Sequence, residues 1–194
     1  MGQHDSTGRY RATEQAFKAL DIRSFHLAAG TPLAAFASGD VVTPGLALDD
    51  SEAAGVRWNN HATPGAIWGS LTLPADRVPD TDVIVHVVAS KTGATVGDAT
   101  SFTLGVFFHP VGALRDADAT AGGATSAMTG NATSKTVQKV TRTIAAADIP
   151  DPTAVTDPCA VLSLSLKPTD ATLGVDDVTV HAVFLEYTRQ DLAA

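Results

Sequence analysis

The side chains that could carry out chemistry are spread thinly along this chain. It has six histidines, but no two of them lie within five positions of each other. A zinc or cupin-like site usually shows a compact histidine cluster with a nearby carboxylate. His86 and His181 could approach such a cluster if their strands were adjacent, with Glu186 beside them. We expect no metal site, and histidines that are either exposed or satisfied by hydrogen bonds.

No residue stands out as a candidate for nucleophilic or acid–base catalysis either. The sequence has no G-x-S-x-G motif, and its single cysteine, Cys159, has no basic or histidine neighbour to activate a thiol. We expect Cys159 to be buried in a strand. The carboxylates that a glycosidase would need stand in turn-like sequences: Asp49, Asp50, Glu52, Asp76, Asp80 and Asp82. The sequence therefore predicts no catalytic residue, no cofactor-binding residue, no cofactor and no enzyme activity.

The two tryptophans leave two interpretations open. Trp58 and Trp68 could form a platform on which sugar rings stack, but a tryptophan in a strand is commonly part of the core. We take the core interpretation, because the apolar residues are mostly small or β-branched and the core needs large pieces. Those expected large pieces are Trp58, Trp68, Phe102, Phe107, Phe108, Phe184 and Tyr187.

Composition limits the class of partner. The 194 residues are 44% hydrophobic and 18% charged, which is enough apolar content for a folded core. Thirteen basic and 21 acidic residues give a formal net charge of −8. Nucleic acids and anionic membranes attract clustered Lys and Arg, so we expect neither as a partner. No apolar run has the roughly 18 residues that span a bilayer.

The pattern of apolar residues predicts an all-β fold. Alternation and turn residues delimit about eight strands, and no long helix is indicated. Long crossings between strand groups favour an antiparallel β-sandwich, jelly-roll or Greek-key like. Residues 1–21 are predicted to be an arm or a short helix, and residues 22–194 a single sandwich domain with a long surface loop at 114–134. The clearest predicted strands are 66–73, 83–89, 100–109, 135–144, 159–166 and 177–187.

Several of these segments resemble small virion proteins of tailed phages. The resemblance covers roughly residues 56–189. The matching segments are G-V-R-W-N-N, G-A-I-W-G-S-L-T-L-P-A-D-R, D-V-I-V-H-V-V-A-S, S-F-T-L-G-V-F-F and D-D-V-T-V-H-A-V-F-L-E-Y. The pattern is similar to that of jelly-roll capsid decoration (cement) or head-fibre proteins. This resemblance implies a non-enzymatic homotrimer on the phage head surface that binds the major capsid protein and bridges neighbouring shell subunits.

Two other function classes remain open. A carbohydrate-binding β-sandwich of a tail fibre or receptor-binding apparatus would present Trp58 or Trp68 in a groove. A cupin-like enzyme would need the histidines to converge on a metal. Buried tryptophans, dispersed histidines and a symmetric trimer would favour the capsid protein.

Overall fold

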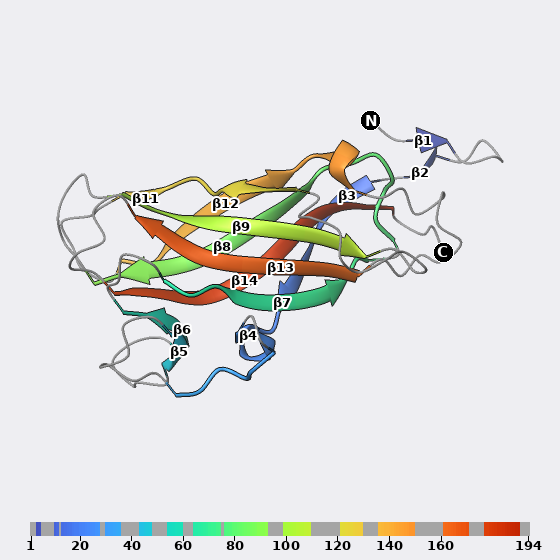
Figure 1. Cartoon of the computed structure of the whole chain (residues 1–194). Coiled ribbons are helices and arrows are strands. Elements are labelled where there is room, and N and C mark those ends of the chain that lie inside the picture. Colours follow the sequence, from blue (N-terminus) through green and yellow to red (C-terminus); the bar gives the residue numbers. More distant parts are fainter. Residues whose placement is uncertain are drawn as a thin grey trace.

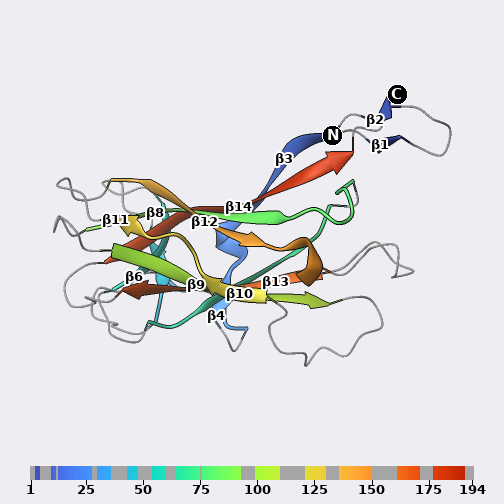
Figure 2. The same cartoon turned by 90° about the horizontal axis from the view of Figure 1, so that it is seen from above.

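A computed structural model shows a two-layer β-sandwich (Figures 1 and 2). It describes residues 3–4, 10–11, 13–27, 30–35, 43–47, 54–59, 64–74, 76–92, 99–109, 121–129, 136–149, 161–170 and 177–190. Within these ranges there is no α-helix, only two short 3-10 turns, η1 (Ile22–Ser24) and η2 (Ala146–Asp148). Accordingly, no helix in the described ranges is long and apolar enough to cross a bilayer.

One layer, sheet I, has six strands in the order β12-β8-β14-β6-β5, with β3 also paired to β14. Every pairing between them is antiparallel. Its strands are β3 (Thr13–Leu20), β5 (Gly45–Ala47), β6 (Gly55–Trp58), β8 (Val83–Lys91), β12 (Gln138–Ile144) and β14 (Val178–Gln190).

The other layer, sheet II, has the order β10-β9-β13-β7-β4, with β11 paired to β9. Its pairings are also antiparallel. Its strands are β4 (His26–Leu27), β7 (Ile67–Thr72), β9 (Ala99–His109), β10 (Ala121–Ala124), β11 (Met128–Thr129) and β13 (Val161–Asp170). Two further strands, β1 (Gln3–His4) and β2 (Tyr10–Arg11), pair only with each other among the described strands.

The chain wraps around the core by changing sheet at nearly every step. From β6 onward it runs through sheets I, II, I and II at β6, β7, β8 and β9. After β10 and β11 it again alternates, through β12, β13 and β14. Such alternation is the connectivity of a jelly roll. The predicted fold class is therefore confirmed, and β7, β8, β9, β12, β13 and β14 fall on the six clearest predicted strands.

The core lies between the two sheets, and alternation along β9 shows how a strand contributes to it. On β9, Phe102, Leu104, Val106 and Phe108 are buried, as the period-2 pattern predicts. Trp58, Phe102, Phe108 and Tyr187 are large pieces of this core, as expected. The prediction was wrong for three others, because their strand positions point to the outer faces: Trp68, Phe107 and Phe184.

Residues 13–20 differ from the expected arm or short helix. They form β3, which pairs with eight consecutive residues of β14, from Leu20 opposite Val183 to Thr13 opposite Gln190. The spacing of Ala16, Phe17 and Leu20 fits a helix, but ten residues make a marginal helix alone. Pairing with β14 provides hydrogen-bond partners for the backbone of these residues and buries Leu20, so the extended form is more stable than a helix.

The expected surface loop at 114–134 also contains regular structure. Residues 121–124 and 128–129 form β10 and β11 on the edge of β9. Met128 is fully buried, and Thr125 accepts a hydrogen bond from the backbone N–H of Phe102 at 3.0 Å. Small residues hide this pairing in the sequence because Ala and Gly give no alternation. The remainder of the predicted loop lies outside the described residues.

Candidate functional site

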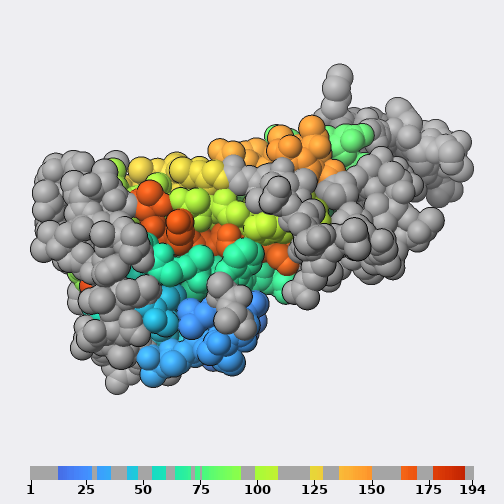
Figure 3. Space-filling model, viewed as in Figure 1, coloured from blue at the N-terminus to red at the C-terminus, as the bar shows by residue number. Residues whose placement is uncertain are grey.

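The solvent side of sheet II carries the candidate site. Figure 3 shows this face, with β9, β13 and β7 side by side. Backbone pairing sets Trp68 of β7, Ser165 of β13 and Gly105 of β9 in one row across the sheet. Residues directly opposite each other in an antiparallel pair point to the same face. The adjacent row consists of Ser70, Ser163 and Phe107.

Trp68 and Phe107 form an aromatic pair that reaches across β13. Their ring centroids lie 5.3 Å apart with an interplanar angle of 36°. Their strands β7 and β9 both pair with β13, so their backbones are about 10 Å apart. The rings can meet because Ser163 and Ser165, the outward residues of β13 between them, are small. The result is one apolar platform on a face that is otherwise polar.

Gly105 gives Phe107 the room to lean towards Trp68. A Cβ at Gly105 would lie 3.2 Å from Cε2 of Phe107 and 2.5 Å from Oγ of Ser165. The phenylalanine ring therefore occupies space that a side chain at Gly105 would need. A glycine at this strand position is one device by which an aromatic ring can lie flat along a sheet.

Hydroxyl groups surround the aromatic pair. Beyond it, Thr103 and Thr169 join their Oγ1 atoms at 2.6 Å, and Ser101 donates to the carbonyl of Thr169 at 3.4 Å. Exposed Lys167 lies directly opposite Thr103, two positions before Thr169 on β13. None of the side chains described on this face is a carboxylate, although the chain as a whole has a net charge of −8. The face thus offers stacking surface and neutral hydrogen-bonding groups, with one cation.

The two tryptophans have different roles in the structure. Trp58 is 2% exposed and its indole N–H donates to the carbonyl of Gly65 at 2.7 Å, which makes it a satisfied core residue. Trp68 is partly exposed, and within the described residues its Nε1 has no hydrogen-bond partner. Buried polar groups are nearly always paired, so the unpaired indole N–H distinguishes Trp68 from Trp58.

The histidines whose side chains are described do not come together as a metal site would require. Nε2 of His86 lies 2.7 Å from a carboxylate oxygen of Glu186, whereas Nε2 of His181 lies 2.9 Å from Oγ of Ser90. In the described parts of the chain, no group of three or more His, Cys, Asp or Glu could hold a metal ion. His86 is 3% exposed and stacks on Phe184 at 4.6 Å, so a substrate in solvent cannot reach it.

A concavity lies at the edge of the outer face of sheet I. Its volume is about 330 Å³, and polar side chains form most of its wall. Three of these side chains are acidic, so this concavity differs in charge from the face of sheet II. The lining residues are Gln15, Asp80, Thr81, Asp82, Ile84, Glu186 and Thr188.

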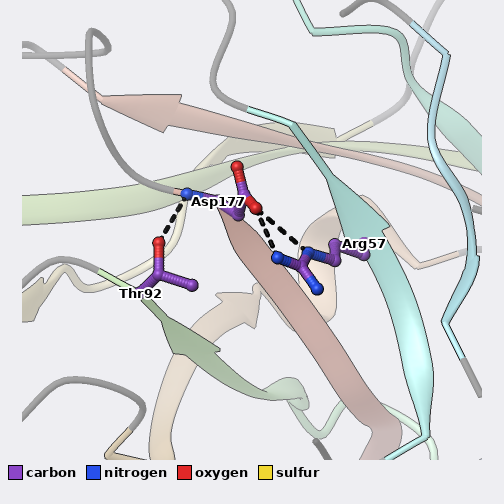
Figure 4. Close-up of polar contacts among 3 residues, drawn as sticks. All are labelled: Arg57, Thr92 and Asp177. Atoms are coloured by element: carbon purple, nitrogen blue, oxygen red, sulfur yellow. Dashed lines mark hydrogen bonds and ion pairs between the residues drawn. The ribbon is translucent and has the colours of Figure 1, made fainter. Parts of the chain in front are cut away.

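One polar cluster ties three strands of sheet I together (Figure 4). Asp177, just before β14, accepts hydrogen bonds from Nη2 and Nε of Arg57 at 2.5 and 3.2 Å. Its backbone N–H donates to Oγ1 of Thr92 at 2.9 Å, and the N–H of Thr92 donates to the carbonyl of Asp177 at 3.0 Å. Asp177 thus links β14 to β6 through its carboxylate and to the end of β8 through its backbone.

Several residues singled out in the sequence lie outside the described residues. They are Asp49, Asp50, Glu52, His61 and Cys159, and the side chain of His109. Two of the remaining turn carboxylates have structural contacts. Asp82 accepts from the backbone N–H of Ala146 at 2.8 Å, and Asp76 accepts from the Tyr187 hydroxyl at 3.4 Å. The sequence pattern assigns both Trp68 and Phe107 to the core, so their contact on the outer face was not predicted.

Comparison with known proteins gives distant structural similarity alone. No protein-family model and no curated protein sequence matches the chain. A solved structure described as a xylan-binding module CBM15 superposes with a TM-score of 0.47 at 14% identity, over 90% of this chain and 97% of that one. A Family 16 Carbohydrate Binding Module-2 gives a TM-score of 0.27 at 15% identity, over 71% and 74% of the two chains.

Proposed function

We propose that the chain is a carbohydrate-binding β-sandwich whose ligand lies on the outer face of sheet II. The observation that carries this proposal is the Trp68–Phe107 pair. The two rings meet across Ser163 and Ser165 of β13, and other hydroxyl groups border them. Sugar rings have apolar C–H faces and equatorial hydroxyl groups. The C–H faces can pack on an aromatic platform, and the sugar hydroxyl groups can exchange hydrogen bonds with serine and threonine side chains.

The charge of the face supports a neutral or weakly acidic glycan. Carboxylates are absent from its described side chains, and Lys167 is its one described cation apart from any charge on histidine. The concavity beside sheet I, with Asp80, Asp82 and Glu186, would repel an acidic ligand and has no exposed tryptophan among its lining residues. The sheet II face is therefore the better candidate for a polysaccharide chain.

The proposal is tested by measuring binding to a panel of soluble neutral and acidic polysaccharides, by affinity electrophoresis and then calorimetry. Trp68→Ala removes the larger ring of the platform. Truncation of a central aromatic contact commonly costs about 2 kcal/mol, which corresponds to a roughly 30-fold weaker Kd. Phe107→Ala should weaken binding in the same direction because the remaining indole loses its neighbour.

Phe184→Ala is the matched control, since Phe184 is an aromatic side chain on the outer face of the opposite sheet. It should leave glycan affinity unchanged. If no polysaccharide binds, or if Phe184→Ala weakens binding while Trp68→Ala does not, the assignment of the site to sheet II is wrong.

Attachment to a phage capsid stays a separate prediction that rests on the sequence resemblance. A glycan-binding face is compatible with a receptor-binding protein of a virion, where contact with surface polysaccharide is the first step of adsorption. Co-sedimentation of the purified chain with phage capsids, compared with its binding to host polysaccharide, separates the two roles.

A further inference from the structure

Lys167 is a cation without a counter-charge on the outer face of sheet II. Its side chain is exposed, and it forms no hydrogen bond or ion pair with any residue in the described parts of the chain. By contrast, Arg57 on the opposite sheet contacts the carboxylate of Asp177. The ammonium group of Lys167 is therefore available to a ligand that lies on this face.

The residues next to Lys167 are small and uncharged. It lies directly opposite Thr103 on β9, and Thr103 in turn lies opposite Ala124 on β10. Two positions earlier on β13 is Ser165, which stands in the row of Trp68. Because none of these neighbours carries a charge, they neither compete for the ammonium group nor repel an anion that approaches it.

A hydroxyl proton is available beside the ammonium group. The Oγ1 atoms of Thr103 and Thr169 lie 2.6 Å apart, so one of these two hydroxyl groups donates to the other. The accepting hydroxyl keeps its own proton and can rotate to direct it at a ligand, while the ammonium group of Lys167 has three donors and no acceptor. This end of the face thus combines donors with positive charge, which is the chemistry that binds an anionic group.

The distance between the aromatic pair and Lys167 suits a ligand that extends along β13. Trp68 lies opposite Ser165, and Lys167 follows Ser165 by two residues, so the two rows are about 7 Å apart. A sugar ring stacked on Trp68 directs its own substituents, or those of the next ring, towards the lysine. A polysaccharide chain along β13 can therefore contact the aromatic pair and Lys167 at the same time.

The formal net charge of −8 does not oppose this contact. Three described carboxylates, those of Asp80, Asp82 and Glu186, line the concavity of the opposite sheet. Stacked sheets lie about 10 Å apart, and salt screens exposed charges beyond about 8 Å at physiological ionic strength. An anion on the outer face of sheet II is thus screened from those carboxylates, whereas it contacts the ammonium group directly.

We propose that Lys167 selects glycans that carry a singly charged anionic substituent, with the sugar chain stacked on the Trp68–Phe107 pair and directed along β13. This inference rests on the proposed function, because it needs a sugar to lie on the aromatic pair. A uronic acid carboxylate and a sulfate ester both carry a single negative charge and both accept hydrogen bonds. The ligand class is therefore an acidic polysaccharide.

Polysaccharides whose anionic groups can be removed test the role of Lys167. The probes are polygalacturonate with its carboxyl-reduced form, and carrageenan with its desulfated form, measured by calorimetry on the full chain. An exposed ion pair changes affinity by up to about fivefold, so the unaltered chain should bind a charged form about fivefold more tightly than its neutral form. Lys167→Gln should abolish this preference and leave the affinity for the neutral form unchanged. A preference confined to one pair of probes identifies the anion as carboxylate or sulfate.

Lys139→Gln is the matched control, because Lys139 is an exposed lysine of β12 on the other sheet. It should keep the full preference for the charged form. Added sodium chloride should reduce the preference of the unaltered chain and have little effect on Lys167→Gln. Charged forms that bind no better than neutral ones, or a preference that survives Lys167→Gln, would overturn the role of Lys167.

Trp68→Ala separates this inference from the function on which it rests. If the site is correct, this variant should bind the charged and the neutral forms more weakly by the same factor. A chain that binds neutral polysaccharide through Trp68 without preferring a charged form would keep the proposed function and overturn the role of Lys167. A chain that binds no polysaccharide, charged or neutral, would overturn both.

Discussion

Substitution of Gly69 by alanine tests how the two sheets are locked together. Gly69 faces the core from β7, and a Cβ there would lie 2.7, 2.8 and 2.9 Å from three carbons of the Phe25 ring. Normal carbon contacts are near 3.5 Å, so the ring must withdraw by roughly 0.8 Å. Phe25 is 1% exposed and part of the core, which leaves it little space.

Overpacking of this kind costs about 1–3 kcal/mol, and the lower chain entropy of the unfolded alanine variant offsets roughly 0.5 kcal/mol of it. We therefore expect Gly69→Ala to lower the free energy of unfolding by about 1–2 kcal/mol. Urea denaturation followed by fluorescence measures the change, with an unaltered slope against urea.

A double-mutant cycle identifies the cause. Phe25→Leu alone should also destabilise the fold, but in the Gly69→Ala background it should restore space. The loss of unfolding free energy in the double variant should therefore be smaller than the sum of the two single losses by about 1 kcal/mol. Gly105→Ala is the control, because its neighbours are the mobile Oγ of Ser165 and the outward ring of Phe107. Additive effects, or a loss below about 0.5 kcal/mol for Gly69→Ala, would refute the packing of Phe25 on β7.

Two further predictions concern polar contacts of sheet I. Asp177→Asn removes the charge that Arg57 contacts at 2.5 Å. Thermal or urea unfolding should show a loss of about 1 kcal/mol in the free energy of unfolding, and Asp177→Glu should lose less. An unchanged stability would mean that solvent screens the ion pair. For Tyr187, burial and then the nearby charge of Asp76 raise the pKa above its ordinary value of 10.0. The folded state therefore keeps this proton more tightly than the unfolded state. The stabilisation is complete below pH 10 and is lost as pH rises through the folded pKa, so Tyr187→Phe should show a weaker decline of stability above pH 10; parallel curves would contradict this assignment.

Alternation made the interior of the long strands predictable. On β9 the period-2 pattern gives both faces correctly, because each side chain meets either core or solvent. It failed at β3, where eight residues fit a helical and an extended pattern, and a ladder with β14 more than 150 positions away decides between them. It failed again at residues 121–129, whose small side chains carry no pattern.

The candidate site was harder to predict than the fold. Alternation along residues 66–73 sets Trp68 on the face opposite Ile67, but its size favoured the core, and that prediction was wrong. Its contact with Phe107 depends on β13 lying between β7 and β9. That strand order is a property of the sandwich topology and not of local sequence. The alternation of serine and leucine along residues 162–166 was the available signal, since it predicts a face of small polar residues beside an apolar one.

A nuclear magnetic resonance titration with the best-binding oligosaccharide of the panel tests the carbohydrate site most directly. The chain has two indole N–H groups, one paired with Gly65 in the core and one, on Trp68, without a partner among the described residues. Binding on sheet II should shift the Trp68 indole resonance and leave that of Trp58 in place. A Trp68 resonance that stays unchanged at saturation, with shifts instead on β3, β8 and β14, would contradict the proposed site.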